Sequence, residues 1–404
     1  MHNKRLKLLH KYPFERLSDL KKGLIGNTDF QHISLSLGEP RNHPPNLIYE
    51  YMLDPLLLEN GLTTYPKVRG ESYLRESISR WLRSRFNIEA NPDEQILPVT
   101  GTREALFSIA QAVVSGKKDA QIVLPNPFYQ IYEGASLLAN ASPFYVPANP
   151  ENNYLPDYEK VPEVIWKKCE LLYVCSPGNP TGRTISLETF RFLLSKAEEH
   201  NFIIAADECY SEIYLNTPPI GLLQAAKAIG NERFDNCLIF HSLSKRSNLP
   251  GLRSGFVAGD SYLIENYLKY RTYHGCAMPI QHQKASAAVW DDEKHVMVNR
   301  ESYGKKFGSV TPILKKVTTV KDPDGGFYHW LATPFDDQKF ARELFINCNI
   351  TVLPGSYLGR ETNGNDTEKR KHNPGRNHIR VAWVDETEKC VEAATRMVNW
   401  WRSL

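Results

Sequence analysis

Short apolar runs alternate with helix-like segments between Leu47 and Met278. The runs read QIVLP, ELLYVCS, FIIAAD, CLIFHSL and SGFVAG, and amphipathic segments such as RESISRWLRSRF and EALFSIAQAVVS accompany them. Apolar strands that show no polar alternation are typical of parallel sheets covered by helices on both faces. The pattern therefore predicts an α/β layered fold with these runs as parallel strands.

The two ends of the chain have different patterns. Residues 1–46 combine a short amphipathic piece at 14–24 with the strand-like ISLSLGEP. After Pro279, a long helical stretch at 281–306 precedes the strand-like pieces GGFYHWLA, ITVLPGS and HIRVAW and a final helix in ETEKCVEAATRMVNWWRS. We therefore expect an N-terminal arm that leads into the small domain (1–46), a large domain (47–279) and a small α+β domain (280–404).

One segment near the C-terminus is polar throughout. RETNGNDTEKRKHNPGR, residues 360–376, combines charged side chains with glycine and proline. Such a composition predicts a mobile surface loop.

Composition excludes several classes of protein. Of the 404 residues, 41% are apolar and 24% are charged, which is typical of a folded globular chain. The net charge of +3 comes from dispersed basic residues, so we expect neither nucleic acid nor a membrane as a partner. No apolar run approaches the ~20 residues that span a bilayer, and no apolar signal region follows the basic start. The 7 cysteines form no CxxC pair, which predicts reduced thiols in the cytoplasm and no metal site.

Polar or glycine-bearing tails follow three of the predicted strands, in LLYVCSPGNPTG, FIIAADECY and CLIFHSLSK. The carboxyl ends of parallel strands meet at one edge of a sheet, where such folds bind their ligands. Lys245 lies there in a serine-rich turn, and a lysine held away from water can lose its proton and form a Schiff base with an aldehyde. The hydroxyls of Ser242 and Ser244 and the guanidinium of Arg253 would suit a phosphate beside this lysine.

Two readings stay open for the neighbouring tails. Asp207 is a common type of helix cap, or it could keep a pyridine nitrogen protonated, so that the ring withdraws electrons. Tyr210 is a packed aromatic, or it reaches the phenolic oxygen of that ring. Asn179 in SPGNPTG is a turn former, or it donates to the same oxygen.

Four further side chains complete the candidate set. Thr102 and Arg103 open a helix in TGTREALF, and helix N-termini attract anions, although many begin in this way without a ligand. Tyr129 in PNPFYQIYEG could stack on a cofactor ring or belong to the core. Arg380 lies inside the apolar strand HIRVAW and needs a charge partner, which a substrate carboxylate would supply. The order of these features along the chain, rather than any single one, indicates an enzyme site.

This combination resembles the fold-type I aminotransferases of class I and II over essentially the whole chain. The resemblance implies a large domain with a mostly parallel seven-stranded sheet, a smaller α+β domain, and pyridoxal 5'-phosphate bound to Lys245 as a Schiff base. It also implies that Asp207 pairs with the pyridine nitrogen, while Asn179 and Tyr210 contact the ring oxygen. The phosphate ligands it implies are Thr102, Arg103, Ser242 and Arg253, with Tyr129 stacked on the ring, and Ser244 is expected among the residues that bind the cofactor.

The same resemblance implies how substrates and subunits meet. Arg380 matches the arginine that holds the substrate α-carboxylate, and Gly38 lies on the substrate-side loop with Asn179 close by. Tyr65 in TTYP matches a tyrosine that reaches the phosphate of the other subunit. The resemblance therefore implies a homodimer with shared sites, in which amino donors and 2-oxoglutarate are the small-molecule partners.

Six segments are similar to the proteobacterial type of succinyldiaminopimelate aminotransferase: KYPFERL, SLSLGEPRNHP, PNPFYQIYEGA, HSLSKRSNLPGLRSGFVAGD, YRTYHGCAMP and VLPGSYLGRETNG. This similarity implies amino transfer from N-succinyl-LL-2,6-diaminopimelate to 2-oxoglutarate, in lysine and peptidoglycan-precursor synthesis. The stretch NDTEKRKH departs from the shorter loop of that type, so the contacts of this loop stay open.

Other functions remain alternatives. An acetylornithine, aspartate or aromatic aminotransferase would use the same cofactor residues, as would a C–S β-lyase or a decarboxylase. A non-catalytic pyridoxal-phosphate sensor would need a helix-turn-helix segment before the α/β region, and a dehydrogenase would need GxGxxG after an early strand. The sequence has neither.

Overall fold

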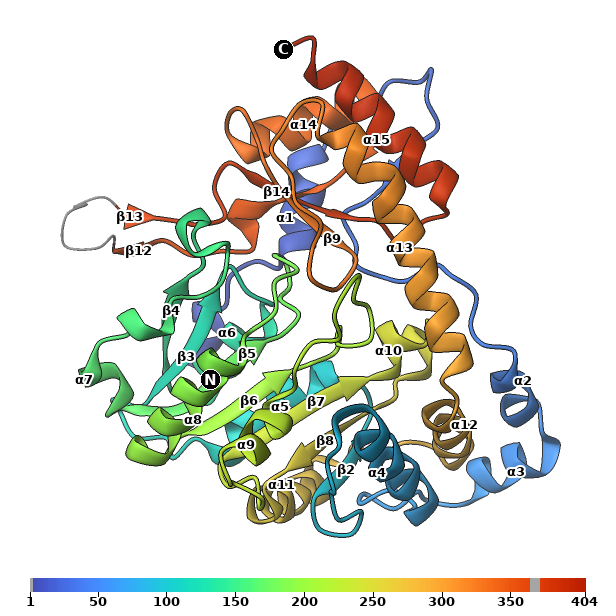
Figure 1. The fold of residues 1–404 in the computed structure, drawn as a ribbon, viewed down its shortest axis with the longest axis vertical. Coiled ribbons are helices and arrows are strands. Elements are labelled where there is room, and N and C mark those ends of the chain that lie inside the picture. Colours follow the sequence, from blue (N-terminus) through green and yellow to red (C-terminus); the bar gives the residue numbers. More distant parts are fainter. Residues whose placement is uncertain (1–2, 364–370) are drawn as a thin grey trace.

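The computed structural model describes residues 3–363 and 371–404. A seven-stranded sheet lies at its centre, formed by β2 (Ile96–Val99), β3 (Gln121–Asn126), β4 (Ser142–Pro147), β5 (Cys169–Cys175), β6 (Ile203–Asp207), β7 (Cys237–Ser242) and β8 (Gly255–Gly259). The strands are arranged in the order β2-β8-β7-β6-β5-β3-β4 (Figure 1). The predicted α/β fold with a mostly parallel seven-stranded sheet is confirmed.

Strand β8 departs from the parallel pattern. The sequence grouped SGFVAG with the parallel strands, but β8 runs antiparallel to both of its neighbours, β2 and β7. Between β7 and β8 the chain forms only α10 (Leu243–Arg246) and the short helix η4 (Pro250–Leu252). These elements reverse the chain, whereas a parallel neighbour requires a crossover connection.

Helices cover both faces of the sheet. One face packs against α4 (Ser72–Phe86), α8 (Leu187–His200), α9 (Leu222–Ala228) and α12 (Ile280–Asp291). The opposite face packs against α5 (Thr102–Val113), α6 (Ile131–Leu138) and α11 (Ser261–His274). Along β5, Leu172 and Val174 belong to the first core, and Leu171 and Tyr173 belong to the second. Burial on both faces explains why the strand sequences lack polar alternation.

The part of the chain predicted to form the small domain has its own sheet and core. Strands β9 (Tyr328–Ala332), β11 (Leu353–Pro354) and β14 (His378–Ala382) form an antiparallel sheet, in the order β11-β14-β9. Near it, β1 (Ile33–Ser34) pairs in parallel with β10 (Ile350–Thr351). Helices α13 (Lys294–Leu314), α14 (Asp337–Cys348) and α15 (Thr387–Trp401) pack around the same core (Figure 1).

The helical stretch predicted at 281–306 is divided into α12 and α13. Asp292 adopts an extended backbone after α12, and its carboxylate accepts a hydrogen bond from the His295 amide at 3.2 Å. This bond satisfies an amide in the first turn of the next helix, whose N-cap residue is Glu293. Because α12 packs against the large sheet, the domain boundary at residue 279 stays a prediction.

The remaining elements are η1 (Lys4–Leu8), α1 (Pro13–Lys21), α2 (Leu47–Met52), α3 (Pro55–Thr63), η2 (Pro150–Asn152), η3 (Tyr158–Lys160), α7 (Glu163–Trp166), η5 (Gly355–Tyr357), β12 (Thr362–Asn363) and β13 (Lys371–His372). The last two form a projecting antiparallel pair (Figure 1), where the sequence predicted only a loop. Residues 364–370, the middle of that predicted mobile loop, lie outside the described residues. The 7 cysteines are free, and none of the described helices is long and apolar enough to span a membrane.

Candidate active site

A cavity of about 470 Å³ lies at the carboxyl ends of β5, β6 and β7. It brings together side chains from the N-terminal segment, the large domain and the small domain. All the site residues predicted from the sequence line it except Tyr65: Gly38, Thr102, Arg103, Tyr129, Asn179, Asp207, Tyr210, Ser242, Ser244, Lys245, Arg253 and Arg380. Tyr65 follows α3 and is 98% exposed.

Lys245 presents its amine to the cavity from α10. Its Nζ donates to the carbonyl of Gly38 at 2.6 Å. Burial lowers the pKa of Lys245 to about 8, and the positive charges of Arg380 and Arg103 act in the same direction. A Cβ atom on Gly38 would lie 1.8 Å from the Tyr328 hydroxyl, so only glycine lets the backbone pass this close to Tyr328. The amine can therefore lose its proton near neutral pH, as attack on an aldehyde requires.

Asp207 is buried at the end of β6. Its Oδ2 accepts a hydrogen bond from the Tyr132 hydroxyl at 2.6 Å, and its Oδ1 accepts one from the Cys209 amide at 3.3 Å. Burial raises the pKa of Asp207, while both hydrogen bonds oppose the rise. Asp207 does not cap a helix. The residues that follow it form a turn, and no described helix begins there. A buried carboxylate that faces a cavity is suited to a cationic ring nitrogen.

Arg380 is buried on β14 and forms no ion pair among the described residues. Its two Nη atoms donate to Asn179 Oδ1 at 2.8 Å and to the Ser36 carbonyl at 2.7 Å. Its Nε has no hydrogen-bond partner within the described chain. A buried guanidinium with an unused donor is suited to a carboxylate ligand.

Two tyrosine contacts shape the wall of the cavity. The hydroxyls of Tyr210 and Tyr328 lie 3.0 Å apart. Burial raises the pKa of Tyr210 well above its usual value, so this phenol stays protonated and can donate a hydrogen bond. Arg103 Nε donates to the Tyr129 hydroxyl at 2.6 Å.

The start of α5 forms an anion cradle with the turn after α10. Gly101 precedes Thr102 with a φ of +85°, and a Cβ on it would lie 2.1 Å from Arg253 Nη2. Arg253 therefore lies directly over the helix N-terminus. The hydroxyls of Ser242 and Ser244 lie 2.9 Å apart on the same wall. Free amides, hydroxyls and an arginine at a helix start bind phosphate, so these residues fit the phosphate of pyridoxal phosphate.

Several lining residues were not predicted from the sequence, because no local motif distinguishes them: Tyr12, Phe14, Leu37, Glu39, Gln130, Cys209, Pro250, Tyr328, Leu353 and Leu358. Tyr132 was also not predicted; its hydroxyl donates a hydrogen bond to Asp207, but it does not line the cavity. It lies three residues after Tyr129 in the quoted PNPFYQIYEG, so the aromatic cluster was the available signal.

Known proteins with the same architecture identify the chain. The family model "Aminotransferase class I and II" matches residues 31–387. An LL-diaminopimelate aminotransferase of Aquifex aeolicus is 30% identical, with 98% of each chain covered. The crystal structure of an aminotransferase from Neisseria meningitidis has a TM-score of 0.93 at 43% identity and covers 99% of this chain and 100% of its own. That of aminotransferase AspB from Helicobacter pylori has a TM-score of 0.88 at 36% identity and covers 98% and 100%. The chain belongs to the class I and II aminotransferases, a family that uses pyridoxal phosphate.

Proposed function

We propose that this aminotransferase moves an amino group from N-succinyl-LL-2,6-diaminopimelate to 2-oxoglutarate, in lysine and diaminopimelate biosynthesis. The observation that carries the proposal is the composition of the cavity wall. Five of the six segments that resemble succinyldiaminopimelate aminotransferases contribute lining side chains, for example Tyr12, Leu37, Gln130, Pro250 and Leu358. Similarity concentrated on the wall of a cavity bears on the substrate more directly than similarity in the core does.

The charge of the cavity also supports this donor. Four basic side chains line it, namely Arg103, Lys245, Arg253 and Arg380, against the two acidic groups of Glu39 and Asp207. Arg253 faces the phosphate cradle, and Asp207 faces the proposed position of the ring nitrogen. Lys245 holds the cofactor, so Arg103 is the basic side chain left to suit a donor and an acceptor that each carry a carboxylate beyond the one held by Arg380.

Each site residue then has a defined task. Pyridoxal phosphate, when bound, supplies the conjugated ring that withdraws electrons from the substrate Cα. Lys245 holds the cofactor in the resting enzyme and then, as a free amine, moves the proton to and from Cα. Asp207 keeps the ring nitrogen protonated, and Arg380 orients the α-carboxylate, with Asn179 fixing its guanidinium.

We also infer a homodimer with composite sites and a cytoplasmic location. Class I and II aminotransferases act on amino acids and keto acids and are typically dimeric. The exposed side chains of Leu53, Leu56, Leu62 and Tyr65 form an apolar surface around α3 that suits a second copy of the chain. Biosynthetic relatives and seven free cysteines support the location.

LL-diaminopimelate itself is the second candidate donor. Relatives at 27–31% identity from several bacteria are named LL-diaminopimelate aminotransferases. This donor lacks the succinyl carboxylate and carries a second ammonium group, so the two candidates differ by two charges at the distal end.

Steady-state rates with 2-oxoglutarate and a panel of donors test the proposal. The panel contains the N-succinyl compound, LL-diaminopimelate, N-acetylornithine, aspartate and phenylalanine. We expect the N-succinyl donor to exceed LL-diaminopimelate, aspartate and phenylalanine by at least ~100-fold in kcat/KM, on the order of 3 kcal/mol. A polar site rejects donors that leave its groups unpaired, which is the physical reason. N-acetylornithine is the nearest competitor, because it also pairs a distal amino group with an acylated α-amine. A faster rate with LL-diaminopimelate would replace the proposed donor and leave the aminotransferase assignment intact.

A further inference from the structure

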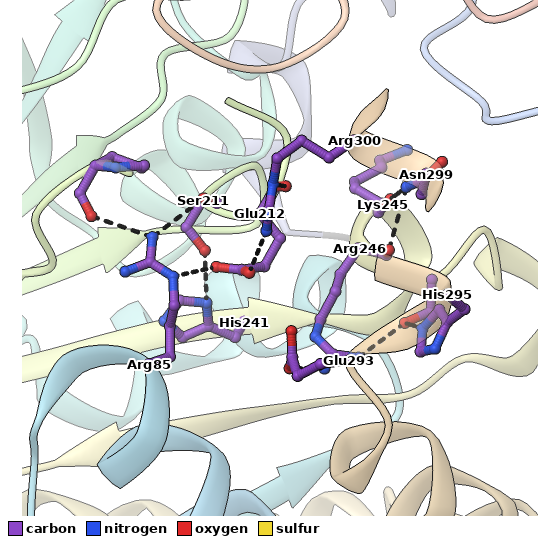
Figure 2. Close-up of polar contacts among 12 residues, drawn as sticks. Arg85, Ser211, Glu212, His241, Lys245, Arg246, Glu293, His295, Asn299 and Arg300 are labelled. Atoms are coloured by element: carbon purple, nitrogen blue, oxygen red, sulfur yellow. Dashed lines mark hydrogen bonds and ion pairs between the residues drawn. The ribbon is translucent and has the colours of Figure 1, made fainter. Parts of the chain in front are cut away.

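Helix α10, which carries Lys245, is a single helical turn. The end of any helix leaves carbonyl groups without partners inside the helix. Asn299 on α13 meets two of them: its Nδ2 donates to the Lys245 carbonyl at 3.1 Å and to the Arg246 carbonyl at 3.2 Å. Figure 2 shows the Asn299 amide facing the backbone of these two residues. The lysine backbone is thus held by a side chain that is distant in the sequence.

The other end of the same amide is also fully used. Asn299 Oδ1 accepts from Asn42 Nδ2 at 3.1 Å and from Asn248 Nδ2 at 3.0 Å. Asn299 is only 4% exposed, so water cannot replace these bonds at low cost. With two donors and two acceptor sites occupied, the amide has one defined orientation.

Asn42 connects this contact to the substrate side of the cavity. It belongs to the N-terminal segment 36–42, whose Gly38 carbonyl accepts from Lys245 Nζ and whose Ser36 carbonyl accepts from Arg380. Asn299 therefore joins the backbone of the lysine turn to the segment that contacts the lysine amine.

Helix α13 itself is fixed next to Asn299 and farther along its length. Arg300 donates to the Glu212 carbonyl at 3.0 Å and to its carboxylate at 3.1 Å, and Glu212 is also bound by Arg85 at 2.7 Å (Figure 2). Farther along α13, Phe307 and Val310 are buried in the small-domain core. The helix gives Asn299 a rigid support, as a precise positioning role requires.

We propose that Asn299 is a positioning residue for Lys245, which holds the lysine-bearing turn in register with segment 36–42. The inference rests on the proposed role of Lys245 as the cofactor lysine. Without the amide, the turn keeps its Arg246 anchor to the Val289 carbonyl but loses the hydrogen bonds to its last two carbonyl groups. The amine then no longer returns to one position between the cofactor and Cα.

The test compares holoenzymes of Asn299→Ala and the milder Asn299→Ser, whose hydroxyl can still donate one bond. We expect Asn299→Ala to lower kcat by about 10- to 100-fold, as displacements near 1 Å do, with little change in KM for either substrate. The midpoint of the pH titration of the cofactor's visible absorbance should also move by about half a pH unit or more, because the environment of the lysine nitrogen changes. Asn299→Ser should lie between Ala and wild type in both measurements.

Asn373→Ala is the matched control. Asn373 is a buried asparagine whose Nδ2 donates to the Ser356 carbonyl, away from the lysine turn. We expect this variant to change the melting temperature without moving the absorbance midpoint. If Asn299→Ala does not fold, the kcat and absorbance midpoint of Asn299→Ser test the inference instead. Wild-type kcat and midpoint in the folded variants, or an equal shift in the control, would overturn the inference. Borohydride trapping and peptide mapping separate it from the proposed function, because an adduct on another lysine would refute the role of Lys245 itself.

Discussion

Burial acts on Lys245 and Asp207 in opposite directions on the pKa scale and for the same reason. Removal from water disfavours a charge, so it lowers the pKa of the lysine and raises that of the aspartate. The amine of Lys245, whose pKa is about 8, is mostly neutral above that pH. The aspartate accepts two hydrogen bonds that favour its ionised form. The site therefore holds a free amine and a carboxylate at the same pH.

The first prediction concerns cofactor capture by the apoenzyme. Only the neutral amine of Lys245 attacks the aldehyde, and its pKa of about 8 lies below the ordinary 10.5. The capture rate should therefore rise with pH, reach half its maximum near pH 8 and level off about one unit above. Stopped-flow absorbance of apoenzyme mixed with pyridoxal phosphate measures this rate. A rate that still climbs steeply above pH 9.5 would mean that the amine is solvated, and Lys245→Ala should show no covalent capture.

The second prediction concerns Asp207. Asp207→Asn keeps the shape and removes the charge, so kcat should fall by roughly 10²- to 10³-fold, while the phosphate ligands retain the cofactor. Tyr132→Phe is the comparison variant. It removes a donor that lowers the pKa of Asp207, so that pKa should rise further and the acidic limb of the kcat profile should move to higher pH. Near-normal turnover in Asp207→Asn would leave the carboxylate with a structural role only.

At the scale of elements, the continuous apolar runs predicted the positions of the strands well. The runs at QIVLP, FIIAAD and CLIFHSL became β3, β6 and β7, because continuous apolar strands are buried on both faces. The direction of a strand was harder to predict from the sequence. Strand β8 is antiparallel because of how the short connection before it folds, and the pattern of apolar residues contains no information on that connection. The division between α12 and α13 depends on the extended backbone at a single residue, Asp292.

The candidate site shows the same limit. Residues at strand tails, such as Asp207 and Lys245, were predictable because parallel strands end at one edge. Tyr328 and Asn299 were not, because they reach the site from elements that approach it only in the folded chain. Sequence patterns report local spacing, whereas these contacts depend on packing between domains.

The third prediction belongs to the start of α5. Gly101→Ala places a methyl group 2.1 Å from Arg253 at a residue with a φ of +85°. Arg253 must move, so the affinity for pyridoxal phosphate should fall by at least about tenfold, the equivalent of one lost charged hydrogen bond. Gly116→Ala is the control, since its φ is +73° with nothing within 4 Å. It should lose only about 1 kcal/mol of stability through backbone strain. Cofactor titration of both apoenzymes separates the two effects, and equal affinities would contradict the cradle.

The whole molecule assembles its cavity from parts of the chain that are far apart. The large domain supplies Lys245 and Asp207, the small domain supplies Arg380, and segment 36–42 contacts both sides. Helix α13 extends from α12 beside the large sheet to α15 in the small domain (Figure 1). Relative motion of the two domains would therefore change the distance between the Lys245 amine and the Arg380 guanidinium.

One predicted site residue lies outside this cavity, and the proposed homodimer would bring it there. Tyr65 is 98% exposed and lies among exposed leucines at positions 53, 56 and 62. If it reaches the phosphate of the other subunit, each active site combines Lys245 of one chain with Tyr65 of its partner. Subunits of Lys245→Ala and Tyr65→Ala, each inactive or weak alone, should then restore activity when they are unfolded and refolded together. In a random mixture about half of the dimers are hybrids with one intact site each, so about a quarter of wild-type activity should return. Mixing without refolding is the control, because dimers that do not exchange should regain nothing. Sedimentation of the wild type as an active monomer, or no recovery in verified hybrids, would show that Tyr65 serves no shared site.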